Sequence, residues 1–201
     1  PLTPMKLSIQ HLGRALEISK GENRDTLKDF QEKMLQQIRI LTEIADEFSN
    51  YAELPKGKMQ ELDLIEIIHK IINLFKHEEK VKFNVNYQKN ISFGLIGDEN
   101  QLIRVFNNLI QNSLQAMNSK GFIEINCIKT KVNLEVHFKD NGPGIPLEIH
   151  QKIFEPKFPT KSKGKGLGLA LVWQIISKHN AKISISNHSQ GAQFIISFNL
   201  L

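Results

Sequence analysis

Apolar residues recur at steps of three and four through the first quarter of the chain. One series ends before a polar turn at residues 20–23, and a longer, heptad-like series follows it. This spacing places apolar side chains on one face of a helix, so it predicts two amphipathic helices joined as a hairpin. The members of the two series are Leu2, Met5, Ile9, Leu12 and Leu16, then Leu27, Phe30, Met34, Ile38, Leu41, Ala45, Phe48 and Ala52.

A single helical hairpin cannot enclose its own apolar face. Pairing with a second copy of the chain, as an antiparallel four-helix bundle, buries that face from both sides. We therefore expect residues 1–54 to form a homodimer.

The pattern changes after a linker at residues 55–60, which contains proline, glycine and lysine. Residues 61–201 mix helical periodicity with short alternating stretches, which predicts an α+β domain with a mixed sheet and helices on one face. Helices are expected at 64–75, around residues 102–112 and after residue 167. Strands are expected at 81–87, 121–128, 132–138, 182–186 and 193–199.

A glycine-rich segment, residues 164–168, leads directly into the last predicted helix. Its free backbone amides and the positive end of the helix dipole suit a triphosphate. The Lys-Ser/Thr ending of a P-loop is missing, and so is the early position of a dinucleotide-binding motif. A flexible hinge is the alternative reading of these glycines.

Two further segments supply groups that a nucleotide site needs. The Asp140 carboxylate can accept a hydrogen bond from an adenine amino group, while glycines at 142 and 144 let the backbone approach the base. Asn108 and Asn112 share one helix face, and an amide oxygen is a ligand that Mg²⁺ tolerates. Each segment also has an ordinary reading, a strand-ending turn or a solvated helix face. Their order within one domain-sized stretch favours the nucleotide site.

Together these segments resemble those of the sensor histidine kinases, in the superfamily that includes gyrase-type and chaperone-type ATPases. Residues 108–112 look like the N-box, 140–144 the first glycine box, 153–158 the F-box and 164–168 the second glycine box. The resemblance implies a Bergerat-type ATP-binding fold, ATP and Mg²⁺ as cofactors, and a mobile lid at about 155–166. The nucleotide-binding residues that it implies are Asn108, Asn112, Asp140, Gly142, Gly144, Ile145, Phe154, Phe158, Lys161, Gly164, Gly166, Leu167 and Gly168.

In that family's terms Asn112 ligates Mg²⁺ and Asp140 reads adenine. Many relatives carry a basic residue three or four positions after the magnesium asparagine, where this chain has Gln115 and Ala116. We expect Lys161 to meet the phosphate charge instead, with the lysines at 163 and 165 as further candidates.

The residue at position 108 separates kinases from hydrolases. The related ATPases usually carry a glutamate there that activates water, whereas this chain has Asn108. Without that base, hydrolysis should be slow, and the γ-phosphate should wait for a histidine imidazole. The implied function is the cytoplasmic kinase core of a bacterial two-component system, which phosphorylates a histidine for relay to a response-regulator aspartate. The alternatives are a gyrase- or chaperone-like ATPase and a catalytically silent dimeric scaffold.

Residues 1–54 resemble the dimerisation and histidine-phosphotransfer domain of the same family, but residues 1–4 match the stretch that follows the phosphoacceptor. The acceptor histidine is therefore expected upstream of residue 1, and this piece alone is not expected to autophosphorylate. His11 lacks an adjacent acid and lies too far along the helix to be the acceptor. Residues 46–52 resemble kinases of the nitrogen-regulation class.

Composition narrows the remaining possibilities. The formal net charge is +5, but the lysines are spread along the chain without an aromatic-basic stripe, so nucleic acid is not an expected partner. The lone Cys127 excludes a disulfide within the chain and is expected in a buried strand of a cytoplasmic protein. No apolar run approaches a membrane span, so we expect no membrane contact by this piece, although parents of the family often carry membrane domains.

Overall fold

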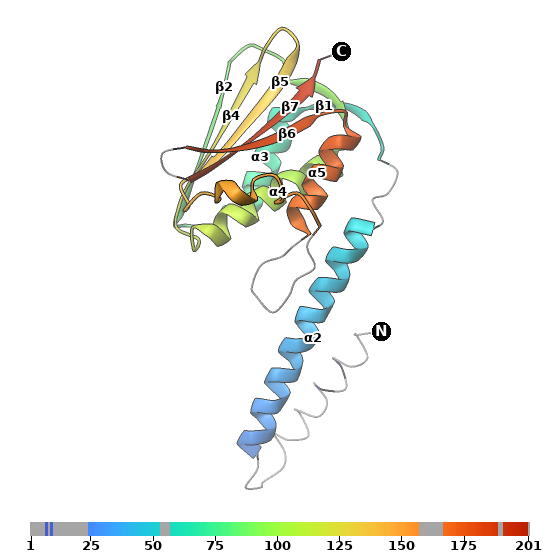
Figure 1. The fold of residues 1–201 in the computed structure, drawn as a ribbon, viewed down its shortest axis with the longest axis vertical. Coiled ribbons are helices and arrows are strands. Elements are labelled where there is room, and N and C mark those ends of the chain that lie inside the picture. The colour runs from blue at the N-terminus through green and yellow to red at the C-terminus, as the bar shows by residue number, and fades with distance from the viewer. Residues whose placement is uncertain are drawn as a thin grey trace. The chain divides into compact units, whose positions relative to one another are not determined.

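A computed structural model describes residues 7, 9, 24–52, 57–156, 167–188 and 191–200. The chain divides into two units, Pro1–Glu53 and Leu54–Leu201. Each unit is described by itself (Figure 1).

The first unit contains helix α2, Arg24–Ala52, where the sequence predicts the longer helix. Gln31 Nε2 donates a hydrogen bond of 3.1 Å to the backbone carbonyl of Ile9, which is itself helical. The rest of the expected first helix lies outside the described residues. On α2, Phe30 is 55 % and Leu41 51 % exposed. Large apolar side chains of the predicted stripe therefore remain uncovered within one chain.

The second unit is built on a five-stranded sheet of order β2-β4-β5-β7-β6. Only the β2–β4 pair is parallel, so the sheet is mixed, as predicted. The strands are β2 (Val81–Tyr87), β4 (Gly121–Lys129), β5 (Asn133–Asp140), β6 (Lys182–His188) and β7 (Gly191–Asn199).

Three helices cover one face of this sheet (Figure 1): α3 (Leu64–Leu74), α4 (Glu99–Ala116) and α5 (Gly168–Lys178). Burial alternates along β5, from Leu134 to Asp140, because successive side chains point to opposite faces. The buried set packs beneath the apolar stripes of the helices. The predicted α+β class, with helices on one side, is confirmed.

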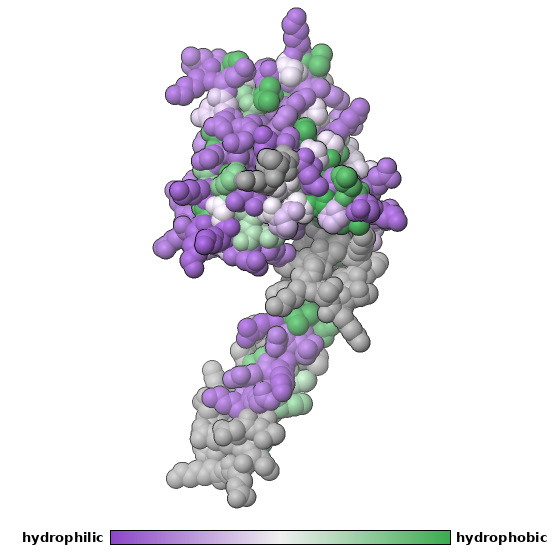
Figure 2. All heavy atoms as spheres, turned by 60° about the vertical axis from the view of Figure 1, so that its left-hand side comes forward, coloured by the Kyte–Doolittle hydropathy of each residue, from purple (hydrophilic) through white to green (hydrophobic). Residues whose placement is uncertain are grey.

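The other face of the sheet is mostly polar. Asn86 Nδ2 donates to Asn126 Oδ1 at 2.8 Å, and Lys139 lies 3.5 Å from Glu124. In Figure 2 the side of the second unit that is turned forward is mostly hydrophilic. This face is therefore suited to contact with solvent and contributes little to the hydrophobic core.

Two short strands and a 3₁₀ turn were not predicted. β1 (Gln60–Asp63) pairs antiparallel with β3 (Gly94–Gly97) as a separate small sheet. β1 begins at Gln60, the last residue of the expected linker. The turn η1 covers Leu147–Ile149. Among the described residues, no helix is long and apolar enough to cross a membrane.

Cys127 is buried in β4, as expected from the sequence. Burial, with a smaller contribution from the Asp63 carboxylate, raises the pKa of its thiol to about 12. Because the thiolate is the reactive form, iodoacetamide should not label the folded protein at pH 8 but should label it in denaturant. Mass spectrometry of both samples checks this. Rapid labelling of the native protein would show that the Cys127 thiol is accessible, contrary to the structure.

Candidate functional site

Asp140, the last residue of β5, is 4 % exposed. Its Oδ2 accepts a 2.9 Å hydrogen bond from Ser113 Oγ on α4. Its Oδ1 accepts from the backbone amide of Gly142 at 2.9 Å and from that of Ala192 on β7 at 3.4 Å. Groups from a helix, a turn and a neighbouring strand thus orient one carboxylate. A carboxylate held this firmly can discriminate between donors, because it cannot turn to suit a different ligand.

The turn after Asp140 is pinned by a side chain from a distant strand. Asn187 Oδ1 accepts from the amide of Ile145 at 3.0 Å, and Asn187 Nδ2 donates to the carbonyl of Ile145 at 2.7 Å. Gly144 has a φ of 76°, a conformation that glycine adopts without strain. A Cβ on Gly142 would lie 2.9 Å from Asp140 Oδ1. The missing side chain at Gly142 therefore lets the backbone of the turn approach Asp140 closely enough for its amide to donate to Oδ1.

Asn108 lies where α4 meets the beginning of α5. Its Nδ2 donates to the carbonyl of Arg104 at 2.8 Å, which fixes the orientation of the amide. A Cβ on Gly168 would lie 2.8 Å from Asn108 Oδ1. The asparagine segment and the last glycine of the second glycine segment are therefore in contact, although some 60 residues separate them in sequence. Asn112 is half-buried on α4.

The beginning of α5 differs from those of α3 and α4. Asp63 and Asp98 cap the latter two helices through their carboxylates, whereas Leu167 stands at the N-cap of α5 and carries no polar side-chain group. The first amides of a helix have no partner within the helix. The amides after Leu167 are thus suited to an anion.

The remaining predicted residues divide into two groups. Phe154, beyond η1, is half-buried. Phe158, Lys161, Gly164 and Gly166 lie outside the described residues, as do the lysines at 163 and 165. The structure therefore describes the floor of the expected site, made by α4, the end of β5 and the beginning of α5.

Sequence reasoning missed three contributors: Ser113, Asn187 and Ala192. Ser113 follows the predicted magnesium ligand directly and is buried among apolar residues of α4. A buried hydroxyl needs a hydrogen-bond partner, which was a signal available in the sequence pattern. Asn187 and Ala192 gave no such signal, because their roles depend on the β6–β7 pairing.

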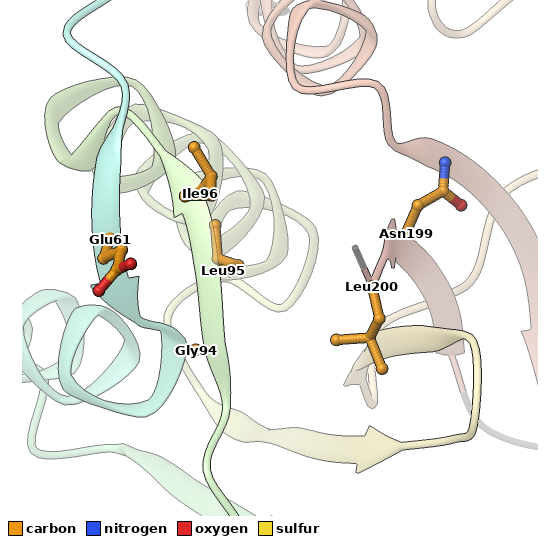
Figure 3. Close-up of a pocket in the computed structure, with 6 residues that line it drawn as sticks. All are labelled: Glu61, Gly94, Leu95, Ile96, Asn199 and Leu200. Atoms are coloured by element: carbon orange, nitrogen blue, oxygen red, sulfur yellow. The ribbon is translucent and has the colours of Figure 1, made fainter.

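Two cavities lie elsewhere in the second unit. One, of about 330 Å³, separates Leu95 and Ile96 of β3 from Asn199 and Leu200 at the end of β7 (Figure 3). The other, of about 440 Å³, lies between the end of α3 and the Gln111–Gln115 side of α4. Neither cavity is lined by Asp140, Asn108 or Gly168.

The family described as histidine kinase-, DNA gyrase B-, and HSP90-like ATPase matches residues 97–201, just over half of the chain. The chain belongs to this family. The matched range contains Asn108, Asn112 and both glycine segments.

Curated relatives point to the nitrogen-regulation kinases within the family. The chain is 27 % identical over 200 residues, 95 % of its length, to nitrogen regulation protein NtrY of Azorhizobium caulinodans. It is 37 % identical over 115 residues, 51 % of its length, to sensory histidine kinase/phosphatase NtrB of Rhodobacter capsulatus. The chain spans 26 % of the first relative's length and 32 % of the second's.

The chain is also similar to solved structures of histidine kinases. The catalytic domain of histidine kinase ThkA matches with a TM-score of 0.64 and 31 % identity, over 71 % of this chain and 97 % of that one. ThkA in complex with response regulator protein TrrA matches with a TM-score of 0.71 and 25 % identity, over 98 % of this chain and 61 % of that one. The second unit is a histidine kinase catalytic domain.

Proposed function

We propose that this chain is the kinase core of a two-component sensor kinase. It binds Mg·ATP and passes the γ-phosphate to a histidine on a dimerisation helix, for relay to a response-regulator aspartate. One observation carries the proposal above all: the buried Asp140 carboxylate is oriented by Ser113, Gly142 and Ala192. It ends a strand next to α4, the helix that bears Asn108 and Asn112. In this proposal the adenine amino group donates a hydrogen bond to this carboxylate.

The phosphates lie between α4 and the beginning of α5. The contact between Gly168 and Asn108 supports this assignment, because it brings uncapped helix amides next to the asparagine face. Lys161 supplies further positive charge from the lid.

Asn112 is the proposed Mg²⁺ ligand. The described residues contain no cluster of three or more His, Cys, Asp or Glu side chains fit to hold a metal. A single amide oxygen fits Mg²⁺ nonetheless, since this ion keeps several waters and takes the rest of its ligands from phosphates. When bound, the ion would neutralise phosphate charge, and Asn112 would orient the triphosphate through it.

The first unit is proposed to make the homodimer. The exposed apolar side chains Leu27, Phe30 and Leu41 on α2 support this, because a stripe of this kind is stabilised by burial against a second copy. The acceptor histidine is proposed to lie upstream of residue 1. The ThkA–TrrA complex among the similar structures supports a receiver domain as the next partner, and a cytoplasmic setting follows from that partner.

Hydrolysis of ATP should be negligible compared with transfer to histidine. Asn108 lies where a water-activating carboxylate would be needed, and its amide is already engaged by Arg104 and adjoins Gly168. The chain is incubated with Mg²⁺ and γ-labelled ATP, with and without the parent's helical segment that includes the residues upstream of residue 1. We expect acid-labile, base-stable label on that segment and little free phosphate. Rapid release of free phosphate by the chain alone would show that it is an ATPase and would overturn the kinase proposal.

A further inference from the structure

Asp98 lies where three parts of the second unit meet. It follows β3 directly, caps α4 and is 8 % exposed. Its Oδ1 accepts from the amide of Gln101 at 2.9 Å, which is the helix cap. Its Oδ2 accepts from the backbone amide of Lys58 at 2.7 Å. One carboxylate therefore starts a helix and also holds the chain where it enters the unit, just before β1.

His179 extends this contact to α5. The backbone amide of Asp98 donates to His179 Nε2 at 3.0 Å, and His179 Nδ1 lies 2.8 Å from the carbonyl of Ile175. A carbonyl only accepts, so Nδ1 carries the proton and Nε2 is the acceptor. The lack of a side chain at Gly97 admits the ring, because a Cβ there would lie 3.1 Å from His179 Cδ2. The Lys58 amide, Asp98 and His179 together are named the linker clamp.

The linker clamp and the Gly168–Asn108 contact join α4 and α5 at two separate points. The clamp links Asp98, at the start of α4, to His179, at the end of α5. Gly168, at the start of α5, adjoins Asn108 farther along α4. Both helices cover about 15 Å between the two points at 1.5 Å per residue, so they form an antiparallel pair braced twice. A change at one brace alters the spacing at the other, since packed helices move as stiff bodies.

We propose that Asp98 and His179 are positioning residues that couple the interdomain linker to the phosphate end of the nucleotide site. The inference rests on the proposed function. The triphosphate is contacted from both α4 and α5, whereas adenine is read by Asp140, which is held from α4, β7 and its own turn. Loosening the linker clamp therefore weakens triphosphate binding more than adenine binding. By reciprocity, a bound triphosphate strengthens the linker clamp.

The sharpest test removes one hydrogen bond without touching α4 or α5. Lys58→Pro deletes the amide that donates to Asp98, and Lys58→Ala, which keeps the amide, is its matched control. Affinities for a non-hydrolysable Mg·ATP analogue and for adenosine are measured on the 201-residue chain, by calorimetry and by NMR titration. We expect Lys58→Pro to lose about five- to tenfold in affinity for the analogue. Adenosine affinity should stay within about twofold, and Lys58→Ala should match the wild type.

Two further variants probe the helix ends. Asp98→Ser keeps a capping oxygen for α4 but is too short to hold Lys58 as well, and His179→Phe keeps a ring without either hydrogen bond. Both should reproduce the selective loss for the triphosphate analogue. Hydrogen exchange gives the reciprocal readout: the Lys58 and Asp98 amides should exchange more slowly with the analogue bound, and adenosine should not produce this effect.

The outcomes separate the two proposals. If a variant lost equal affinity for the analogue and for adenosine, the linker clamp would only support the fold in general. If Lys58→Pro kept the wild-type affinity for the analogue, the linker clamp would not be coupled to the nucleotide site. Either result, with a wild type that binds the analogue, overturns this inference alone. A folded wild type that binds neither ligand overturns the proposed function and the coupling with it.

Discussion

Replacing Asp140 by asparagine should lower the affinity for ATP by about a hundredfold, equivalent to roughly 2.7 kcal/mol. The amides of Gly142 and Ala192 can only donate, so they will keep the oxygen of the new side chain at the Oδ1 position. The NH₂ group then replaces Oδ2 and faces Ser113, whose hydroxyl can turn and accept. The fold is thereby retained, while the adenine amino group meets a donor. Calorimetry with a non-hydrolysable analogue measures the loss.

The matched ligand is the triphosphate whose purine lacks the 6-amino group. Wild type should bind it far more weakly than the ATP analogue, whereas Asp140→Asn should bind the two about equally. Ser113→Ala, which removes only the hydroxyl that orients the carboxylate, should lose a few fold at most. An asparagine variant that still prefers the amino-bearing base would show that Asp140 does not read adenine.

Asn112→Ala should remove most of the contribution of Mg²⁺ to nucleotide binding. Titrations of the ATP analogue in Mg²⁺ and in EDTA separate the metal-dependent part of the affinity from the rest. We expect the variant to lose about tenfold or more in Mg²⁺, roughly 1.4 kcal/mol, and to match wild type in EDTA. The reason is that, in the proposed site, the amide oxygen of Asn112 would act on the nucleotide only through the ion.

Gln111→Ala is the control for this second experiment. Gln111 is the neighbour of Asn112 on α4, is exposed, and lines the cavity beside α3. Its loss should change neither titration. If Mg²⁺ raised the affinity of Asn112→Ala for the ATP analogue as much as it does for wild type, other groups would have to hold the metal. The proposal that Asn112 ligates Mg²⁺ would then be wrong.

The long elements of the second unit were predictable because their periodicity is strong. The strand expected at 182–186 is β6, Lys182–His188, and the one expected at 193–199 is β7, Gly191–Asn199, so their ends are off by two residues. β1 and β3 were missed, since four-residue strands such as Gln60–Asp63 show no alternation long enough to be read. Their pairing joins residues more than 30 positions apart, which only the tertiary fold determines.

Within the candidate site, sequence motifs point to Asp140 and Gly168, but they do not point to the residues that support them. Asp140 and Gly168 were identified from residue type and spacing, and the structure gives both a physical setting. Asn187 was not, because it reaches Ile145 from 42 positions further along the chain. The linker clamp was invisible for a similar reason: Asp98 and His179 meet across 81 positions. Local sequence patterns reveal candidate ligand-binding groups more readily than the distant groups that hold them in place.

The place of β7 in the sheet bears on how the protein is made. β7 is the last strand in sequence but lies between β5 and β6, and its Ala192 contributes to the setting of Asp140. During synthesis, β2, β4 and β5 leave the ribosome long before this partner does. The proposed adenine site is therefore incomplete until translation of the unit is nearly finished. Nucleotide in the cell can stabilise the finished unit, but it cannot guide the folding of the earlier strands.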